Sequence, residues 1–397
     1  MIDLGSAPPS NAYLTEATLR RPEKWFPLRV LVCQNCWLVQ TGDFSQAQEL
    51  FDSDYAYFSA FSSSWLAHCE RFVSDIVASA GLDSGSHVVE IAANDGYLLQ
   101  YFNRLLIPCL GIEPTASTAA AARARGIPII EEFFGVRVAR ELAAKGMQAD
   151  LMVANNVLAH VPDINDFVAG FAVLLRDGGQ ATFEFPHLLR LVTGNQFDTI
   201  YHEHYSYLSL SAVTRIFSAN GLSVFDVQEH PTHGGSLRVF AQRADTGRRK
   251  CSERVEDLVH REQSAGMLTV DFYVRFQTAA ETVKHDFLAF LIHARKQGRS
   301  VAAYGAAAKG NTLINFAGIR PDLIAFAVDR NPAKQGRYMP GSRIPIFPEA
   351  RLLEDKPDYV VILPWNLRQE VVEQLRYIRD WGGQFVTAVP QLEVWAA

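Results

Sequence analysis

Five consecutive residues, Tyr201–Tyr205, could carry proton chemistry. Their order is Tyr-His-Glu-His-Tyr, so two imidazoles, one carboxylate and two phenols stand side by side. Each of these groups needs a polar partner when it is buried, so packing alone rarely explains such a run. Histidine changes its charge near neutral pH and is a common general base. The run therefore indicates proton transfer at a site, and the alternative is an exposed polar loop.

The residues around this run predict a parallel sheet with helices between its strands. Strands are expected at 87–92, 109–112, 127–130, 150–154 and 181–185. Strands that alternate with helices are typical of a doubly wound α/β fold. Two later strands, near 223–229 and 236–241, are close enough in sequence to pair as an antiparallel edge. The Tyr201–Tyr205 run lies between the two groups, where it would overhang a ligand bound by the sheet.

Polar residues follow three of the parallel strands at the edge where such sheets bind ligands. The turn Asn94–Gly96 precedes a helix and can offer backbone amides to a carboxylate or a phosphate. Glu113 ends the second strand, where an acid can accept both hydroxyls of a ribose, and Asn155 and Asn156 end another. The missing G-x-G-x-x-G fingerprint counts against NAD. S-adenosylmethionine, which has no phosphates, tolerates this looser turn. The alternative is an ordinary α/β sheet with polar strand ends.

A second α/β unit follows two charged helices that are expected between 245 and 297. Its strands are expected at 301–304, 323–328, 359–363 and 385–388. The turn Gly305–Thr312 opens a helix and carries Lys309, which suits phosphate binding without being a Walker A sequence. Asp329 and Arg330 follow the second strand of this unit. The alternative to a second nucleotide site is a purely structural docking domain.

Residues 1 to about 60 are expected to be irregular, because several prolines interrupt them. They include Cys33 and Cys36, a C-x-x-C pair that supplies half of the ligands of a tetrahedral zinc site. No second pair follows, so two thiols without a metal are the alternative. Tyr55 belongs to a dense aromatic stretch, which is either core or a lid over a bound cofactor.

Composition and charge narrow the class of protein. The chain has 397 residues, which predicts two or three domains, and 48% of them are hydrophobic. A net charge of -6 argues against a nucleic-acid partner. No apolar run is long enough for a membrane span, and the N-terminus lacks the pattern of a signal peptide. Five cysteines fit a reducing compartment. A cytoplasmic protein, and a monomer, is expected.

Seven stretches together make the chain resemble the nucleotide-sugar C-methyltransferases, which methylate a sugar carbon next to a keto group. The resemblance covers essentially the whole chain. The stretches are Asp3–Gly5, Cys33–Cys36, Asp54–Ser59, Glu90–Leu98, Asn155–Val161, Tyr201–Tyr207 and Gly305–Asn311.

The resemblance implies an α/β enzyme in three parts. Residues 1–60 would form a small zinc-knuckle-like module, 61–244 a central class I S-adenosylmethionine methyltransferase domain with a Rossmann-like fold, and 245–397 a second Rossmann-like domain that binds a nucleotide sugar. The family has another C-x-x-C shortly before the Asp3–Gly5 stretch, where this sequence begins. Zinc is therefore expected only as a half site at Cys33 and Cys36.

The resemblance also implies roles for single residues. His204 would be the general base, with Tyr201 and Glu203 beside it. Tyr55, Asn156 and His160 would face the sugar. Residues expected at the cofactor are Glu90, Asn94, Gly96, Tyr97, Glu113, Pro114 and Asn155, with Glu113 on the ribose. Residues expected at the substrate are Lys309, Asn311, Asp329 and Arg330, with Lys309 near the diphosphate.

The reaction that the resemblance implies is methylation of an NDP-4-keto-6-deoxy sugar, at C3 and on a dTDP-linked substrate, in deoxysugar biosynthesis. A proton next to a ketone becomes removable when the resulting enolate is stabilised, and a histidine suits that step. The alternatives are an NAD-dependent nucleotide-sugar oxidoreductase and a non-catalytic nucleotide-sugar-binding protein. A zinc hydrolase that uses His202 and His204 is a weaker alternative, because H-E-x-x-H spacing is absent.

Overall fold

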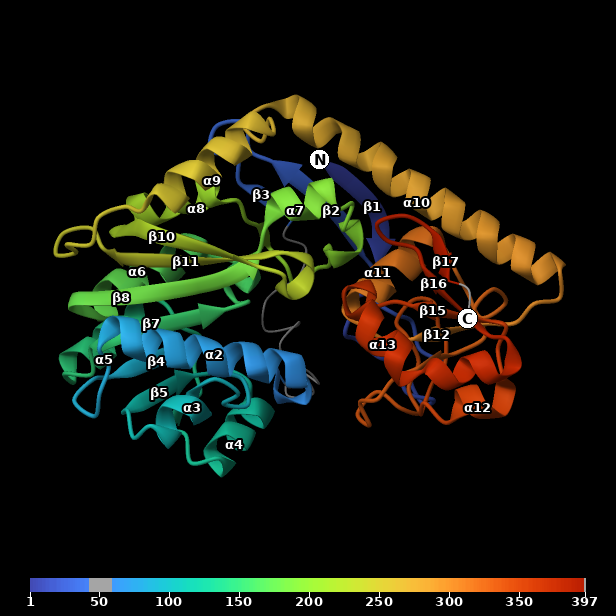
Figure 1. The fold of residues 1–397 in the computed structure, drawn as a ribbon, viewed down its shortest axis with the longest axis horizontal. Helices are drawn as coiled ribbons and strands as arrows, with labels where there is room; N and C mark the ends of the chain where they lie inside the picture. The colour runs from blue at the N-terminus through green and yellow to red at the C-terminus, as the bar shows by residue number, and fades with distance from the viewer. Residues whose placement is uncertain (43–58, 396–397) are drawn as a thin grey trace.

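A computed structural model describes residues 1–42 and 59–395. Tyr55 and the aromatic stretch around it lie outside the described residues. The described chain forms three sheets, which belong to an N-terminal module, a central domain and a C-terminal domain (Figure 1).

The central sheet has seven strands in the order β10-β11-β8-β7-β4-β5-β6. All are parallel except β11, which pairs antiparallel with both β8 and β10. The strands are β4 (Val88–Ile91), β5 (Cys109–Ile112), β6 (Ile129–Ile130), β7 (Ala149–Asn155), β8 (Leu175–Pro186), β10 (Leu222–His230) and β11 (Ser236–Arg243). This order with one reversed strand is that of class I methyltransferases, so the expected central fold is confirmed.

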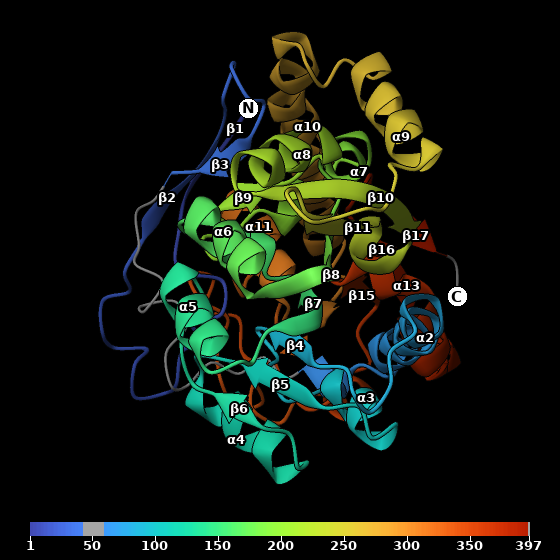
Figure 2. The ribbon, with the colours of Figure 1, turned by 90° about the vertical axis from the view of Figure 1, so that its left-hand side faces the viewer.

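Helices cover both faces of the central sheet, as Figure 2 shows for α2 and α3 on one side and α5 and α6 on the other. One face carries α2 (Ser63–Ala80), α3 (Leu99–Arg104) and α4 (Ala116–Ala124). The other face carries α5 (Val136–Ala144), α6 (Ile164–Leu174) and α8 (Leu210–Ala219). The ends of α2 follow local chemistry, because the Ser62 side chain accepts from the Trp65 amide and Gly81 ends the helix with φ 64°.

The N-terminal module is not irregular, and that prediction is wrong. Strands β1 (Ile2–Ala7), β2 (Phe26–Val32) and β3 (Val39–Thr41) form an antiparallel sheet with β9 (Ser206–Tyr207). Ile2, Leu4, Leu28 and Val30 bury alternate side chains in these strands. The prolines lie at the strand ends or between the strands, so they do not prevent pairing. The pairing of β3 with β9 joins this module to the Tyr201–Tyr205 run.

The C-terminal sheet has six strands in the order β14-β13-β12-β15-β16-β17, of which β17 alone in the sheet runs antiparallel. The strands are β12 (Val301–Tyr304), β13 (Ala327–Val328), β14 (Ile346–Phe347), β15 (Tyr359–Ile362), β16 (Gln384–Thr387) and β17 (Glu393–Trp395). The helices are α11 (Ala308–Ala317), α12 (Arg351–Asp355) and α13 (Arg368–Gln374). The expected second Rossmann-like unit is confirmed. Its strand at 323–328 keeps only two residues, because Leu323 and Ile324 turn back onto the Arg320 carbonyl.

Two helices connect the central and C-terminal domains, as predicted. Helix α9 (Glu253–Ser264) packs its Val255 and Leu258 into the core of the central domain. Helix α10 (Val270–Lys296) then runs along the top of Figure 1 to the C-terminal domain. The domain boundary expected near residue 245 stays a prediction.

Short helices complete the described chain. They are η1 (Ser59–Phe61), η2 (Leu158–His160), α7 (Leu188–Thr193), η3 (Phe197–Thr199), η4 (Thr232–Gly234), η5 (Trp365–Leu367) and η6 (Arg376–Trp381). Within the described residues, no helix combines the length and apolarity that a membrane crossing needs.

Candidate active site

The strand-end loops of β4 and β5 meet at Glu113, as the sequence predicts. One oxygen of Glu113 accepts from the Asn94 amide and the other from the Thr115 amide, both at 2.9 Å. Gly96 has φ 77°, and a Cβ there would lie 2.3 Å from Cδ1 of Ile127. Only glycine suits this left-handed, crowded position. Asn94, Gly96 and Glu113 therefore form one preorganised corner at the carboxyl edge of the sheet.

Buried polar groups lie under the same edge. Oδ1 of buried Asp95 has no hydrogen-bond partner among the described residues, whereas the buried Glu90 carboxyl and the Asn155 side chain both meet the Tyr97 hydroxyl. Burial raises the pKa of Glu90 well above its usual value, and it does the same for the Tyr97 hydroxyl. Orphaned buried polar atoms are rare in proteins. This donor and acceptor set fits a polar ligand such as S-adenosylmethionine. Pro114 beside it has no polar side-chain atom.

The Tyr201–Tyr205 run is largely buried, so an exposed loop is excluded. The Tyr205 amide donates to the Ala159 carbonyl at 2.8 Å. Thr41 binds the run twice, through its amide to the Tyr205 carbonyl and through its hydroxyl to the His204 carbonyl at 2.7 Å. The N-terminal module and η2 thus hold the run in place from two sides.

The hydrogen bond of His204 defines its chemistry. Its Nδ1 lies 3.1 Å from the Thr199 carbonyl oxygen, which can only accept, so Nδ1 carries the proton. Nε2 therefore holds the lone pair, as a general base requires. Burial lowers the pKa of His204 well below its usual value, and the nearby His160 adds to this effect. The His204 ring is tilted by 34° against the Tyr201 ring at a centroid distance of 4.0 Å, and it meets the His160 ring edge-on at 4.6 Å.

Glu203 and His160 complete the cluster. His160 donates from Nδ1 to the Glu203 carbonyl at 2.8 Å, and burial lowers the pKa of His160 to about 4. The Glu203 carboxylate points to the N-terminal module, where the Asn11 amide donates to both oxygens at 2.8 Å. Burial raises the pKa of Glu203 to about 7. The cluster thus holds two neutral imidazoles and one carboxyl that titrates near neutral pH.

His202 points away from this cluster. Its Nε2 lies 3.2 Å from the Phe26 carbonyl, whereas His204 turns to Thr199. Among the described residues, no three His, Cys, Asp or Glu side chains lie close enough together to hold a metal ion. The zinc-hydrolase alternative therefore lacks a converging pair of imidazoles.

Asn156 follows the last residue of β7 directly. Its φ is 53°, its amide donates to the Glu184 carbonyl at 2.7 Å, and its buried Oδ1 has no partner within the described part of the chain. Helix η2, which carries His160, begins two residues after Asn156, and the expected role of Asn156 at the sugar stays a prediction.

The substrate candidates of the C-terminal domain separate into two groups. Lys309 faces the central domain: its Nζ donates to Oδ1 of Asn366 at 2.6 Å and lies 4.6 Å from the centroid of the Trp365 ring. Burial lowers the pKa of Lys309. Asn311 does not line a cleft, contrary to its expected role, because it is fully buried and donates to the Ser10 carbonyl at 2.7 Å.

Asp329 and Arg330 form hydrogen bonds with other residues of the C-terminal domain. The Asp329 carboxylate accepts from the amides of Ala306 and Asn331, both at 2.8 Å, and so closes the turn after β12. Arg330 is exposed and donates to Gln374 at 3.2 Å. Their expected role in substrate binding stays a prediction.

The structure also shows a buried ionic cluster that the sequence does not predict. Glu184 in β8 binds His68 of α2 at 2.9 Å, Thr232 of η4 at 3.0 Å, and Arg238 of β11. Burial opposes ionisation, but the His68 hydrogen bond and the Arg238 charge hold the pKa of Glu184 at about 2. The cluster anchors η4, whose His233 lies 5.3 Å from the Trp65 ring. A charged residue between two phenylalanines in a core strand was its only sequence signal.

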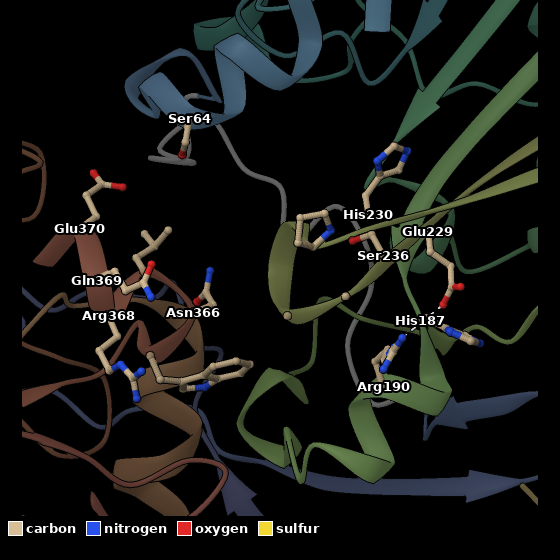
Figure 3. Close-up of a pocket in the computed structure, with 15 residues that line it drawn as sticks. Ser64, His187, Arg190, Glu229, His230, Ser236, Asn366, Arg368, Gln369 and Glu370 are labelled. Carbon is tan, nitrogen blue, oxygen red and sulfur yellow. Dashed lines mark hydrogen bonds and ion pairs between the residues drawn. The ribbon is translucent and has the colours of Figure 1, made fainter. Parts of the chain in front are cut away.

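A cleft of about 780 Å³ separates the central and C-terminal domains. Figure 3 shows Glu229, His230 and Arg190 on its central-domain side. Asn366 and Arg368 line the facing side on the C-terminal domain. The cleft lies between the two strand-end regions, which is where ligands of parallel sheets bind.

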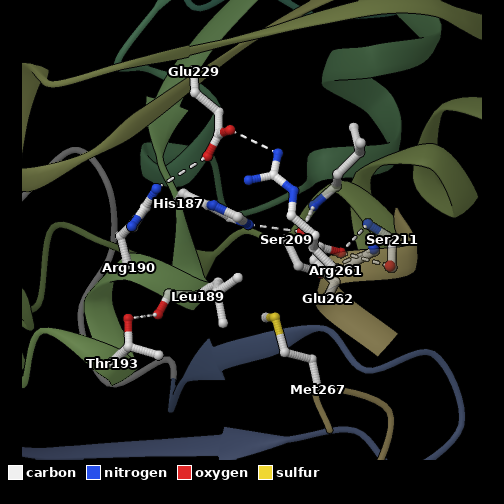
Figure 4. A network of polar contacts seen from close by, with 12 residues as sticks. His187, Leu189, Arg190, Thr193, Ser209, Ser211, Glu229, Arg261, Glu262 and Met267 are labelled. Carbon is white, nitrogen blue, oxygen red and sulfur yellow. Dashed lines mark hydrogen bonds and ion pairs between the residues drawn. The ribbon is translucent and has the colours of Figure 1, made fainter. Parts of the chain in front are cut away.

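A second buried network supports the wall of this cleft (Figure 4). Glu262 of α9 accepts from His187 Nε2 at 2.7 Å and from the amides of Leu210 and Ser211 at 2.7 and 2.8 Å. Burial by itself would raise the pKa of Glu262, yet the hydrogen bond from His187 holds this pKa below its usual value. The carboxylate caps the N-terminus of α8 and fixes α9 against the central domain.

Cys33 and Cys36 lie in the turn between β2 and β3. The Cys33 amide donates to the Leu38 carbonyl, and the Trp37 amide donates to the Cys33 carbonyl, both at 2.9 Å. Structural zinc needs four ligands, and these two thiols find no third His, Cys, Asp or Glu within metal-binding reach among the described residues. The pair alone does not fit a zinc ion.

Comparison with known proteins identifies the class. Residues 65–227 match the model of a methyltransferase domain, residues 231–390 that of the C-methyltransferase C-terminal domain, and residues 1–51 that of a putative zinc binding domain. The chain is also 32% identical over 397 residues to the C-methyltransferase NovU of Streptomyces niveus, covering 100% of this chain and 94% of that protein. The chain belongs to the C-methyltransferase family. The predicted class, an S-adenosylmethionine-dependent methyltransferase, is confirmed.

Two solved structures align with part of the chain. One is magnesium protoporphyrin IX methyltransferase from Synechocystis PCC 6803 with bound SAM, at 16% identity and a TM-score of 0.35, covering 45% of this chain and 79% of that one. The other is the YcgJ protein of Bacillus subtilis, at 13% identity and a TM-score of 0.36, covering 45% of this chain and 99% of that one.

Proposed function

We propose that the enzyme methylates the carbon next to the keto group of a nucleotide-linked 4-keto-6-deoxy sugar. The observation that carries the proposal is the state of His204: its proton is held on Nδ1 by a backbone carbonyl, and its Nε2 lone pair belongs to a neutral, buried imidazole. That state suits removal of a carbon-bound proton, which C-methylation requires and O-methylation does not.

The corner around Glu113 would hold S-adenosylmethionine. Glu113 would accept the ribose hydroxyls with its remaining lone pairs, and the loop from Asn94 to Gly96 would approach the rest of the cofactor. The buried polar groups of Glu90 and Asn155 would find further partners on the cofactor or on water. When bound, the cofactor supplies an electrophilic methyl group.

The proton step uses the cluster around His204. Its Nε2 would take the proton from the sugar carbon, and the electron pair of the broken C–H bond would move to the ketone oxygen as an enolate. Tyr201, whose ring lies 4.0 Å from the His204 ring by centroid distance, is placed to donate its hydroxyl to that oxygen, whereas the N–H of neutral His160 already donates to the Glu203 carbonyl. Donors preorganised toward a developing negative charge lower the barrier.

The cleft between the domains would hold the nucleotide. Lys309 and Arg368 supply positive charge on its C-terminal side, and Arg190 supplies it on the facing side. A diphosphate bound among them would direct the sugar toward His204, because η3 connects the cleft wall to the Tyr201–Tyr205 run. The expected preferences for dTDP and for C3 belong to this proposal.

A substrate panel tests the proposal. The enzyme is incubated with S-adenosylmethionine and 4-keto-6-deoxy sugars linked to dTDP, UDP or GDP, and the products are analysed by mass spectrometry and NMR. We expect a new carbon-bound methyl group next to the keto carbon of a dTDP sugar. A methyl group on oxygen, or no product from any keto sugar, would refute the proposal. Selective turnover of a UDP or GDP sugar would refute the dTDP preference alone.

A further inference from the structure

The C-terminal domain holds the three residues that precede the Tyr201–Tyr205 run. The indole Nε1 of Trp365 donates to Oδ2 of Asp198 at 2.8 Å. The hydroxyl of Thr312 donates to the Ile200 carbonyl at 2.8 Å. Asp198 and Ile200 are fully buried; the Thr312 bond is buried, and the Trp365 bond is partly buried at the cleft wall.

The residue between these two anchors is the one that orients His204. The Thr199 carbonyl accepts from His204 Nδ1 at 3.1 Å and so places the lone pair on Nε2. Thr199 has its own amide bonded to the Gln196 carbonyl at 3.0 Å. Because the residues on both sides of Thr199 are anchored, its carbonyl oxygen points at the imidazole in one fixed orientation. The hydrogen bond at Nδ1 then determines that Nδ1, and not Nε2, carries the proton.

Trp365 is itself fitted closely to the central domain. Gly234 has φ 91°, and a Cβ at this position would lie 2.8 Å from Cη2 of the Trp365 ring. On the C-terminal side, the Lys309 Nζ lies 4.6 Å from the ring centroid. The indole is thus packed between the two domains, with its N–H aimed at Asp198.

We propose that Trp365 and Thr312 are positioning residues for the base: the C-terminal domain sets the tautomer and place of His204 through residues 198–200. This inference rests on the proposed role of His204. Its consequence is that the central domain alone does not hold a competent base, although it contains every residue of the cofactor corner. Binding across the cleft and proton removal are therefore coupled.

Matched pairs of variants test the inference. Thr312→Val removes the hydroxyl and keeps the shape, whereas Thr312→Ser keeps the hydroxyl. Trp365→Phe removes the indole N–H, and Trp381→Phe is its control, because Trp381 donates to the Pro357 carbonyl at 3.0 Å elsewhere in the same domain. The readout is exchange of the substrate α-proton in deuterated buffer with S-adenosylhomocysteine present, together with kcat, KM and the dissociation constant of the cofactor.

We expect Thr312→Val and Trp365→Phe to slow exchange and kcat by about 10- to 100-fold, because small misplacement of a catalytic group has effects of that size. Thr312→Ser and Trp381→Phe should behave like wild type. Cofactor affinity should stay close to wild type in all four. Long-range ¹H–¹⁵N NMR of labelled histidine should show His204 protonated at Nδ1 in wild type and as mixed tautomers in Thr312→Val and Trp365→Phe.

Wild-type exchange rates and an unchanged His204 tautomer in both Thr312→Val and Trp365→Phe would overturn the inference. If the proposed function is wrong, wild type itself will neither exchange the α-proton of a keto sugar nor methylate it, which distinguishes this outcome from a failure of the inference. In that case the NMR spectra would still decide whether the two anchors set the tautomer.

Discussion

Replacing Glu203 with Gln should change how the stability of the enzyme depends on pH. Glu203 is 2% exposed, and its carboxyl meets one neutral donor, Asn11. Burial raises its pKa from 4.5 to about 7. Below pH 4.5 the folded and unfolded states both hold the proton. Between pH 4.5 and 7 the unfolded state releases it and the folded state keeps it. The free energy of unfolding therefore falls as the pH rises through this window.

The size of this effect follows from the pKa difference. A shift of one pKa unit corresponds to about 1.4 kcal/mol, so Glu203 costs the folded state roughly 3 kcal/mol at pH 8 relative to pH 4. Glutamine cannot ionise and carries no such cost. The free energy of unfolding of Glu203→Gln, measured relative to wild type, should therefore rise by about 2.5 kcal/mol between pH 5 and pH 8.

Urea unfolding at pH 5, 6, 7 and 8 measures this difference. The control is Glu16→Gln, which makes the same chemical change at an exposed position. We expect the Glu16→Gln difference from wild type to stay flat with pH. If the Glu203→Gln difference is equally flat, Glu203 is ionised in the folded protein throughout this range, and the argument from its burial is refuted.

Three further perturbations have defined outcomes. Gly96→Ala should destabilise the protein by about 1–3 kcal/mol in thermal unfolding, because the residue has φ 77° and its Cβ would collide with Ile127; an unchanged melting temperature would contradict the crowding. Arg238→Met should cost about 3–5 kcal/mol, since it leaves the buried Glu184 carboxylate without its cation; a loss below about 1 kcal/mol would show that the ion pair is dispensable. Glu113→Ala should weaken S-adenosylmethionine binding in calorimetry by about 10-fold or more, through the lost charge-assisted hydrogen bonds; an unchanged affinity would remove Glu113 from the cofactor site.

The central fold could be predicted because its signals are local. Strand β4 is buried at all four positions and lies between helices, and α6 presents an apolar face that begins after the Asp163 cap. Periodicity and capping report such features within a window of about 15 residues. The same reasoning predicted the strand-end positions of Asn94, Glu113 and Asn155.

The N-terminal sheet could not be predicted in this way. Strand β3 pairs with β9, so Gln40 lies opposite Ser206. Strands β3 and β9 have three and two residues, too few for an alternating pattern to stand out. The pairing depends on contacts between distant segments, which a local pattern does not report.

The supports of the active site were missed for a related reason. Trp365 and Asp198 are 167 residues apart, and His68 and Glu184 are 116 apart. Each residue alone is an ordinary tryptophan, histidine or acid, and only the fold brings the partners together. Asn311 shows the opposite error, because a sequence motif implied ligand contact where the structure has a buried bond to Ser10.

The most direct test of the central claim is the fate of the hydrogen on the accepting carbon. A dTDP-4-keto-6-deoxy sugar deuterated at C3 is incubated with S-adenosylmethionine and either wild type or His204→Ala, and the products are read by mass spectrometry. The account predicts that wild type loses the deuterium and gains one methyl group, whereas His204→Ala does neither while still binding the cofactor. Retention of the deuterium in a methylated product, or wild-type turnover by His204→Ala, would contradict it.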